Sequence, residues 1–207
     1  MRLSLAEFEA MNSPTRRFLQ KHVEFKTFLK MGLKGEGQEI LEIGCGNGYG
    51  AALLSSLKPA GYHGIDIMPE QIALARDRAP AGFEFSVLDA GKLSVFASAS
   101  KDIVVIFGIL HHVPEWRKAL AECHRVLRPG GFLYIEEPDS RLIQMWDKIF
   151  RWNHPDQGRF TLQELERAME FLGFGIEEKR SLLPWFAAYR VRKTSFSPAA
   201  APGNSIQ

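Results

Sequence analysis

The sequence predicts an α/β fold in which a doubly wound, mostly parallel sheet is covered by helices on both faces. Strand-like and helix-like segments alternate from residue 39 to residue 136, which is the pattern of β–α–β units. The segment Ile103–Ile106 is apolar without alternation, as expected for a central strand that helices cover on both sides. A glycine-rich stretch directly follows the first strand, and glycines there permit a tight turn into a helix. A chain of 207 residues has room for one such domain.

The individual elements follow from apolar runs and from their start and stop signals. The run Arg128–Gly131, with sequence RPGG, ends a helix and turns the chain into the next strand. Thr161 and Glu164 have the spacing of a capping box at the start of a later helix. The last two strands are close in sequence, so they are expected to pair antiparallel at the sheet edge. We expect strands at 39–43, 62–66, 83–88, 102–107, 132–136, 174–180 and 185–193, and helices at 51–57, 69–79, 114–127 and 161–173.

The N-terminal segment lies outside this alternation. Ser13 followed by Pro14 is a good helix start, because serine caps a helix and proline suits its first position. Apolar residues then give the helix an apolar side, and Gly32 can end it. We therefore expect residues 1–37 to form a helical appendage over the functional site and residues 38–194 to form the main domain.

Two further segments interrupt or follow the main domain. Residues 139–160 hold Trp146, Phe150 and Trp152 among basic residues, and we interpret them as a helical insertion that helps to form a substrate pocket. Ordinary packing is the alternative role for these aromatic side chains. Residues 195–207 are rich in Ser, Ala, Pro and Gly, a composition that predicts a disordered tail.

Composition and charge argue against several classes of partner. The net charge of +2 gives no global reason to expect nucleic acid or membrane binding. Residues 1–34 do carry seven Lys or Arg against three Glu, a surplus that a solvated helix face explains. Two cysteines are too few for a disulfide framework, and no His/Cys cluster has zinc-site spacing, so no metal is expected. Without a long apolar run or a signal sequence, we expect no membrane span and a cytoplasmic location.

The strongest chemical signal is the run from Glu42 to Gly50, with sequence EIGCGNGYG. Its glycines let a ligand approach the backbone closely, and the helix that follows favours a negatively charged group at its N-terminus. Counted from Gly44, the dinucleotide pattern G-x-G-x-x-G fails at Tyr49, and counted from Gly46 it fits only the looser form ending in Ala51. The run therefore predicts a ligand site without identifying the ligand.

Two aspartates follow the next two strands at the same edge of the sheet. Asp66 comes 22 residues after Gly44, where a carboxylate can accept hydrogen bonds from both hydroxyls of a ribose. Asp89 follows the third strand, where a carboxylate can accept from an adenine amino group or, alternatively, serve as a turn residue. Together these positions predict a ligand that contains adenosine.

With these residues in place, the chain resembles the class I S-adenosylmethionine-dependent methyltransferases, in particular the broad group that acts on small molecules and lipids. The matching stretches cover about residues 38–137 in the family's order: Ile40–Gly50, Gly64–Pro69, Leu88–Ala90, Leu110–Pro114 and Arg125–Gly131. The resemblance implies a Rossmann-like, seven-stranded sheet with a C-terminal antiparallel strand. It also implies S-adenosylmethionine as the cofactor, S-adenosylhomocysteine as the product, and in-line displacement of the methyl group to a small-molecule or lipid-like acceptor.

The resemblance further implies where the cofactor binds. The methionyl part would be surrounded by Glu42, Gly44, Cys45, Gly46 and Gly48. Asp66 would hold the ribose and Asp89 the adenine, with Ile67, Ala90 and Phe107 as neighbouring cofactor-binding candidates.

His111 and His112 are the catalytic candidates, because they lie just beyond the fourth strand, where ligands of parallel sheets bind. A neutral histidine can take a proton from an acceptor hydroxyl. The alternative is that one histidine packs or orients the loop and neither moves a proton. Glu136 and Glu137 end the fifth strand, and either one faces the acceptor or both belong to a solvated strand end.

One other function stays open, and two others are disfavoured by the sequence. A non-catalytic S-adenosylmethionine-binding sensor or partner protein fits the same motifs, since the catalytic residues are not obligatory. Tyr189 and Lys193 have the Tyr-x-x-x-Lys spacing of short-chain dehydrogenases, but they fall in a segment expected to be an edge strand. DNA is not expected as an acceptor, because the segment Phe107–His111 lacks the proline motifs of nucleobase methyltransferases. The oligomeric state is not determined by the sequence.

Overall fold

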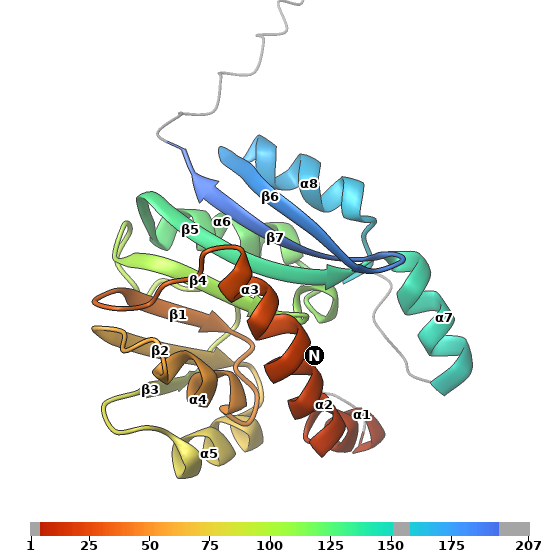
Figure 1. Ribbon diagram of the computed structural model, residues 1–207, viewed down its shortest axis with the longest axis horizontal. Helices are drawn as coiled ribbons and strands as arrows, with labels where there is room; N and C mark the ends of the chain where they lie inside the picture. The colour runs from red at the N-terminus through yellow and green to blue at the C-terminus, as the bar shows by residue number, and fades with distance from the viewer. Residues whose placement is uncertain (1–4, 151–157, 195–207) are drawn as a thin grey trace, which may run out of the picture.

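A computed structural model of the chain describes residues 5–150 and 158–194 and shows a seven-stranded sheet between two layers of helices (Figure 1). The strand order is β3-β2-β1-β4-β5-β7-β6. All pairings from β3 to β5 are parallel, and β7 is antiparallel to both of its neighbours. The strands are β1 (Glu39–Ile43), β2 (Gly61–Asp66), β3 (Glu84–Val87), β4 (Lys101–Phe107), β5 (Leu127–Pro138), β6 (Phe174–Leu183) and β7 (Phe186–Lys193).

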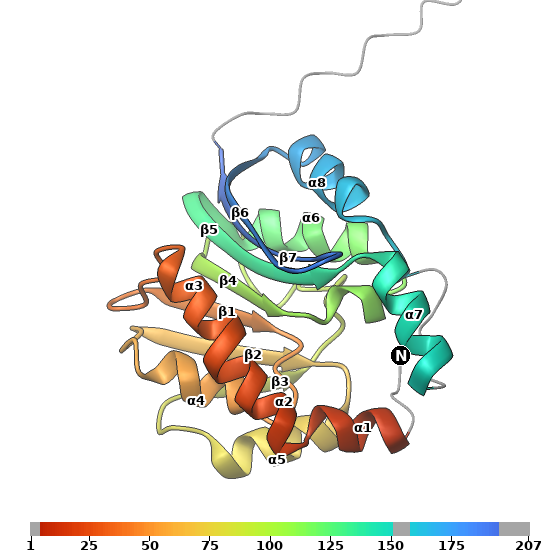
Figure 2. The ribbon, with the colours of Figure 1, turned by 45° about the vertical axis from the view of Figure 1, so that its right-hand side comes forward.

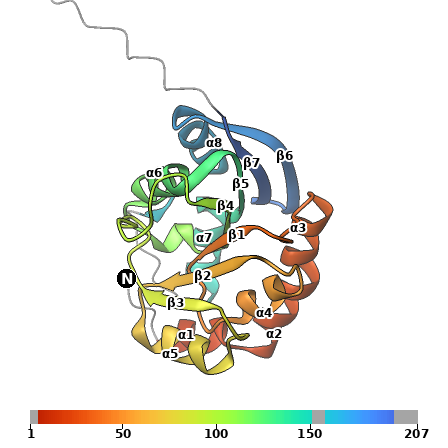
Figure 3. The same cartoon turned by 90° about the vertical axis from the view of Figure 1, so that its left-hand side faces the viewer.

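The helices divide between the two faces of the sheet, as Figure 3 shows edge-on. One apolar core joins α6 and α8 to one face, and a second joins α3, α4 and α5 to the other. The helices are α1 (Leu5–Met11), α2 (Pro14–Leu19), η1 (Gln20–Phe25), α3 (Lys26–Lys30), α4 (Tyr49–Ser55), α5 (Pro69–Arg78), η2 (Leu110–His112), α6 (Trp116–Val126), α7 (Ser140–Phe150) and α8 (Leu162–Phe171). No helix within the described residues is both long and apolar enough to cross a lipid bilayer.

The doubly wound, mostly parallel sheet predicted from the sequence is confirmed. The central position of β4 explains its unbroken apolar run, because Val104, Val105 and Ile106 are fully buried between the helix layers. The expected pairing of the last two strands is also found, and β7 is inserted between β5 and β6, which leaves β6 at the sheet edge. The C-terminal strand is therefore antiparallel and internal.

The start of β5 differs from the sequence-based prediction. The run Arg128–Gly131 was expected to be a turn between helix and strand, but the strand begins at Leu127, whose partner on β4 is Lys101. The pairing shifts in register between Lys101 and Ile103, so the glycines are accommodated as an irregularity within the strand.

The N-terminal segment forms a helical stretch from Pro14 to Lys30. As predicted, the Ser13 hydroxyl caps it by accepting a hydrogen bond from the Arg16 amide at 3.1 Å, and Gly32 follows its end with a φ of +89°. The middle of this stretch, η1, is π-helical, a departure from α geometry that sequence periodicity does not reveal.

The predicted insertion begins as α7, directly after β5. Asp139 connects the end of β5 to both following helices, because its buried carboxylate accepts from the amides of Arg141 and Leu162 at 3.0 Å each. The Arg141 guanidinium also donates to it at 2.8 Å. Burial alone would raise the pKa of Asp139, but these donors hold it below its usual value. Trp152 and the tail 195–207 lie outside the described residues.

We expect Asp139→Ala to destabilise the protein by about 2–3 kcal/mol, because the N-termini of two helices lose the carboxylate that accepts from their amides. Since the folded pKa of Asp139 is lowered, its contribution is present above the unfolded pKa and is lost as the pH falls through the folded value. Chemical denaturation at neutral pH measures the loss. Asp77→Ala, at an exposed position on α5, is the control. Equal stability of the two variants would contradict this role.

Candidate active site

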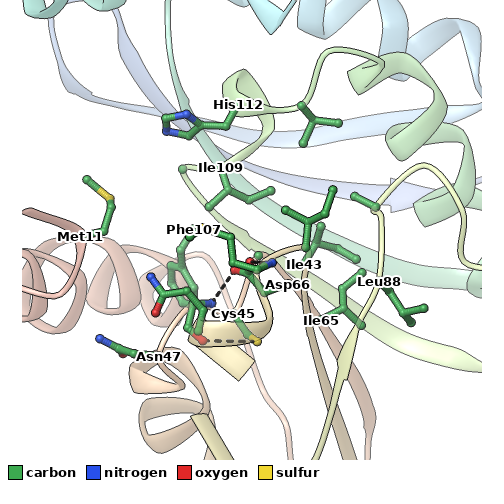
Figure 4. A pocket seen from close by; sticks show the side chains of 18 of the residues that line it. Met11, Ile43, Cys45, Asn47, Ile65, Asp66, Leu88, Phe107, Ile109 and His112 are labelled. Carbon is green, nitrogen blue, oxygen red and sulfur yellow. Dashed lines mark hydrogen bonds between the residues drawn. The ribbon is translucent and has the colours of Figure 1, made fainter. Parts of the chain in front are cut away.

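A cavity of about 360 Å³ lies at the carboxyl ends of β1, β2 and β4, where parallel sheets bind ligands. Figure 4 shows Asp66, Phe107 and His112 around this space, with Met11 of α1 approaching from another side. The residues that line it include Met11, Arg16, Gln20, Ile43, Gly44, Cys45, Gly46, Asn47, Tyr49, Ile65, Asp66, Ile67, Met68, Gln71, Leu88, Asp89, Ala90, Phe107, Gly108, Ile109, His112, Val113, Pro114 and Glu115.

The glycine turn after β1 forms the floor of this cavity. Gly44, Gly46 and Gly48 have φ values of +71°, +51° and +80°, a conformation that L-residues rarely adopt. A Cβ at Gly46 would meet no atom within 4 Å, so that position opens into the cavity, whereas a Cβ at Gly44 would lie 2.4 Å from Ile109. Gly48 does not line the cavity, and a Cβ there would approach the backbone of Ala75 to 3.0 Å. Gly48 therefore serves the packing of α4 against α5.

Glu42 lies beneath the turn and not on the cavity wall. Its buried carboxyl accepts a hydrogen bond of 2.5 Å from the Tyr62 hydroxyl, and it fills the space that a Cβ of Gly50 would need. Burial raises the pKa of Glu42 to about 8, although the Tyr62 bond acts in the opposite direction. Gly50, the last glycine of the run, therefore makes room for a side chain of β1.

Asp66 lies at the end of β2 and faces the cavity. Its Oδ2 accepts from the Gly46 amide at 3.0 Å and its Oδ1 from the Met68 amide at 2.9 Å. Burial raises the pKa of Asp66, and these hydrogen bonds oppose the shift. Each oxygen retains acceptor capacity toward the cavity, since a carboxylate can take about four hydrogen bonds.

Asp89 also lines the cavity, and its side chain is 42% exposed. Its Oδ1 accepts from the Gly91 amide at 2.9 Å, which is the hydrogen bond of a turn-forming aspartate. The structure therefore shows the turn role and the cavity-lining position together. Ile67, Ala90 and Phe107 line the cavity beside these aspartates.

The two histidines occupy different environments. His112 lines the cavity, whereas His111 is buried behind it, and its Nδ1 lies 2.7 Å from Oε2 of Glu137. The same Glu137 carboxyl accepts from the amides of Leu110 and His111 at 2.6 and 3.3 Å. Burial raises the pKa of Glu137 to about 8, against the effect of these amides. Glu137 therefore fixes the short helix that presents His112.

Glu136, the neighbouring strand residue, is fully buried and not solvated. Arg16 of α2 pairs with Glu24 of η1 through distances of 2.6 and 2.7 Å, and Glu136 lies beside this pair. Burial and the charge of Glu24 raise the pKa of Glu136 well above its usual value. Glu136 and Glu24 therefore lie close together where the N-terminal segment meets the end of β5.

Several lining residues were missed by the sequence interpretation. Arg16 and Gln20 look like surface residues of an amphipathic helix, and only the packing of that helix turns them inward. Asn47 occupies a variable position of the glycine run, but it is buried and donates to the Asn12 side chain. Its position between Gly46 and Gly48 was the available signal.

Other expected positions lie away from the cavity. No residue of α7 is among the lining residues, so the described part of the 139–160 insertion does not form this wall. Tyr189 donates to Glu166 at 2.7 Å, and Lys193 donates to the carbonyl oxygens of His124 and Leu127 at 2.6 and 2.8 Å. These partners leave no dehydrogenase-like Tyr–Lys arrangement at the cavity.

Glu42→Gln should make stability less dependent on pH. The folded protein holds the Glu42 proton up to about pH 8, whereas the unfolded carboxyl titrates near 4.5. The stability contribution is therefore full below the unfolded pKa and is lost as the pH rises toward 8. The Tm of the variant should fall less than that of the wild type over this window, and Glu170→Gln, at an exposed position, should match the wild type. A variant curve parallel to the wild-type curve would show that Glu42 is ionised in the folded state.

Known proteins that are similar to this chain are described as methyltransferases. Residues 41–135 match the family model described as methyltransferase domain. Over 145 residues the chain is 36% identical to a phthiotriol/phenolphthiotriol dimycocerosates methyltransferase of Mycobacterium leprae, covering 69% of this chain and 52% of that one. It is 39% identical over 116 residues to a fatty-acid O-methyltransferase of Mycolicibacterium smegmatis, covering 55% and 42% respectively. The chain thus spans about half the length of the curated relatives it matches.

Solved structures show the same fold. A SAM-dependent methyltransferase from Aquifex aeolicus superposes with a TM-score of 0.74 at 18% identity, covering 93% of this chain and all of that one. The family match, the similar sequences and the strand order of the sheet all indicate one family. The chain belongs to the class I S-adenosylmethionine-dependent methyltransferases, a family whose cofactor is S-adenosylmethionine.

Proposed function

We propose that this protein binds S-adenosylmethionine in the cavity at the ends of β1, β2 and β4 and transfers its methyl group to an oxygen of a lipid-like acceptor. The observation that carries the proposal is the convergence of the open glycine turn, Asp66, Asp89 and His112 on one cavity that is closed on one side by apolar residues. A cavity of about 360 Å³ is within the ordinary range for small-ligand sites.

The residues present fit this cofactor. Gly46 leaves open space where any other residue would place a Cβ, so a ligand can approach the backbone there. Asp66, half-buried at the end of β2, offers two oxygens to a pair of vicinal hydroxyls, and Asp89 offers an acceptor about one strand further along the sheet. Leu88 and Ile67 add apolar surface beside the two aspartates for a planar base.

When bound, S-adenosylmethionine supplies an electrophilic methyl group on a sulfonium. The protein's part is to orient the acceptor and exclude water, and orientation alone can supply roughly 7–11 kcal/mol of a bimolecular barrier. Phe107, Ile109 and Val113 give the cavity an apolar wall on the side of η2, and Met11 of α1 approaches it from the N-terminal segment. These residues favour an apolar acceptor at roughly 25 cal/mol per Å² buried.

A polar group of the acceptor would meet a small set of side chains. Arg16, Gln20 and His112 bring polar atoms to the lining. This combination of apolar walls and a few polar groups suits a long chain with one hydroxyl or carboxyl group. The names of the relatives, one for phthiotriol and phenolphthiotriol dimycocerosates and one for fatty-acid O-methylation, point to acceptors of this kind.

His112 is the proposed base for hydroxyl acceptors. It lies on the cavity wall in a short helix that Glu137 fixes through backbone hydrogen bonds, so its position is set by a buried contact. His111 is proposed to be a positioning residue, because its ring contacts Glu137 and does not line the cavity. A carboxylate acceptor is already ionised near neutral pH and needs no base.

The alternative function is that of a cofactor-binding sensor that transfers no methyl group. The same glycine turn and aspartates would serve it, because they act on the cofactor alone. Release of S-adenosylhomocysteine in the presence of a lipid acceptor distinguishes the two functions.

We expect Asp66→Ala to weaken binding of S-adenosylhomocysteine at least tenfold and more than Asp89→Ala does. Asp66 can form two charge-assisted hydrogen bonds of roughly 1.5–3 kcal/mol each, and it also holds the Gly46 amide of the turn, whereas Asp89 can form about one. Isothermal titration calorimetry measures both variants, with Asp77→Ala as a surface control. NAD should give no binding heat. Unchanged affinity in Asp66→Ala would remove Asp66 from the proposed site.

The two kinds of acceptor should respond differently to His112→Gln. Loss of a general base lowers turnover of a long-chain alcohol by about 10²–10⁴-fold, whereas a long-chain fatty acid should be methylated at nearly the wild-type rate. Formation of S-adenosylhomocysteine is measured against pH, and His111→Gln controls for damage to η2. Equal losses with both acceptors would show that His112 only shapes the pocket.

A further inference from the structure

The helical stretch Pro14–Lys30 has an unusual distribution of polar and apolar residues. Polar side chains point inward: Gln20 and Glu24 are buried, and Arg16 lines the cavity. Large apolar side chains point outward: Phe18, Leu19, Val23 and Leu29 are 61%, 44%, 38% and 39% exposed. An ordinary amphipathic helix of a globular protein buries its apolar residues, as this stretch does at Phe25 and Phe28, but does not also expose so many of them. The inward polar residues are explained by the cavity and the Glu24 pair, but the outward apolar residues need another explanation.

The outward face is also basic. Its exposed residues include Lys21, His22, Lys26 and Lys30, and none of the exposed residues between 14 and 30 is acidic. Glu24, the one acidic residue of this stretch, is buried and paired with Arg16. Three of the seven basic residues between positions 1 and 34, Lys21, Lys26 and Lys30, therefore lie on this outward side. We call this surface the basic apolar face, comprising Phe18, Leu19, Lys21, His22, Val23, Lys26, Leu29 and Lys30.

The N-terminal part of the basic apolar face lies beside the proposed site. Arg16 and Gln20, one turn or less from Phe18 and Lys21, line the cavity from the other side of the same helical stretch. Met11 of the preceding helix lines it as well. In Figure 2, α1 and α2 lie at one end of the molecule and α8 at the opposite end. A partner bound to this face would therefore be next to the cavity.

We propose that the basic apolar face docks the protein onto an anionic lipid bilayer, so that a lipid acceptor passes from the bilayer into the cavity beneath the helix. Apolar side chains between lysines are the composition of helices that lie in a membrane interface. The lysines match the negative surface of the bilayer, and each basic residue near such a surface strengthens binding about fivefold. The route for the acceptor rests on the proposed function, whereas docking itself does not.

Vesicle co-sedimentation of the 207-residue chain tests the docking. Vesicles of phosphatidylcholine with about 30% phosphatidylglycerol should bind the wild type, and pure phosphatidylcholine should bind it much less. High salt should weaken the binding, because surface electrostatics are screened. The variants Phe18→Ser/Val23→Ser and Lys21→Glu/Lys26→Glu should each lose binding by roughly tenfold or more.

Matched controls distinguish binding through the basic apolar face from non-specific binding by other exposed residues. Phe171→Ser removes a side chain of α8 that is 79% exposed, more than Phe18, and Arg78→Glu/Arg167→Glu makes the same charge change at exposed positions on α5 and α8. These controls should bind vesicles like the wild type. Equal losses in the controls, or no binding of the wild type to anionic vesicles, would overturn the proposal.

Two further measurements keep the outcomes distinguishable. Calorimetry with S-adenosylhomocysteine should show unchanged affinity in all face variants, which verifies folding. If the wild type binds anionic vesicles but methylates no lipid, docking stands and the proposed acceptor fails. The alternative is that a second copy of the chain binds the basic apolar face, and analytical ultracentrifugation measures whether a dimer forms. A dimer that Phe18→Ser/Val23→Ser dissociates, in place of vesicle binding, would contradict docking on a bilayer.

Discussion

The turn from Gly44 to Gly48 is the constraint on which the proposed site depends. Three of its five residues have positive φ, so the chain leaves β1 and enters α4 without any side chain projecting at Gly46. The turn is fixed to β2 by hydrogen bonds from the amides of Gly44 and Cys45 to the Ile65 carbonyl oxygen, and by the bond from Gly46 to Asp66. Asp66 therefore shapes the floor of the cavity and faces it at the same time.

Three buried carboxyl groups lie behind the residues that line the cavity. Glu42 supports the glycine turn and Glu137 fixes η2, whereas Glu136 lies beside Glu24 where the N-terminal segment meets the end of β5. Each is removed from water, which raises the pKa of Glu42, Glu136 and Glu137. Buried polar groups stabilise a fold when their hydrogen bonds are satisfied, as those of Glu42 and Glu137 are, so these two carboxyls specify one arrangement of the segments that they join. The walls of the cavity are thereby held without a metal or a disulfide in the described residues.

The N-terminal stretch connects the cavity to the outer surface. Its inner side contributes Arg16 and Gln20 to the lining, and Phe28 packs on the sheet against Phe107 and Tyr134. Burial of Phe25, Phe28 and Met31 therefore holds the C-terminal half of the stretch, whereas the half nearest the cavity is held mainly by polar contacts. The π-helical turn lies where these two kinds of packing meet.

The sequence by itself determined the alternation of strands and helices, the glycine turn and the two strand-end aspartates, because these depend on local periodicity and on conformations that few residues tolerate. It also indicated the family, whose motifs lie within one continuous stretch. It did not distinguish His111 from His112, since adjacent residues on a short helix point in directions that only Glu137, distant in sequence, decides. The inward placement of Arg16 and Gln20 and the burial of Glu136 were likewise decided by tertiary structure, because the direction in which a polar side chain points depends on what the rest of the chain packs against it.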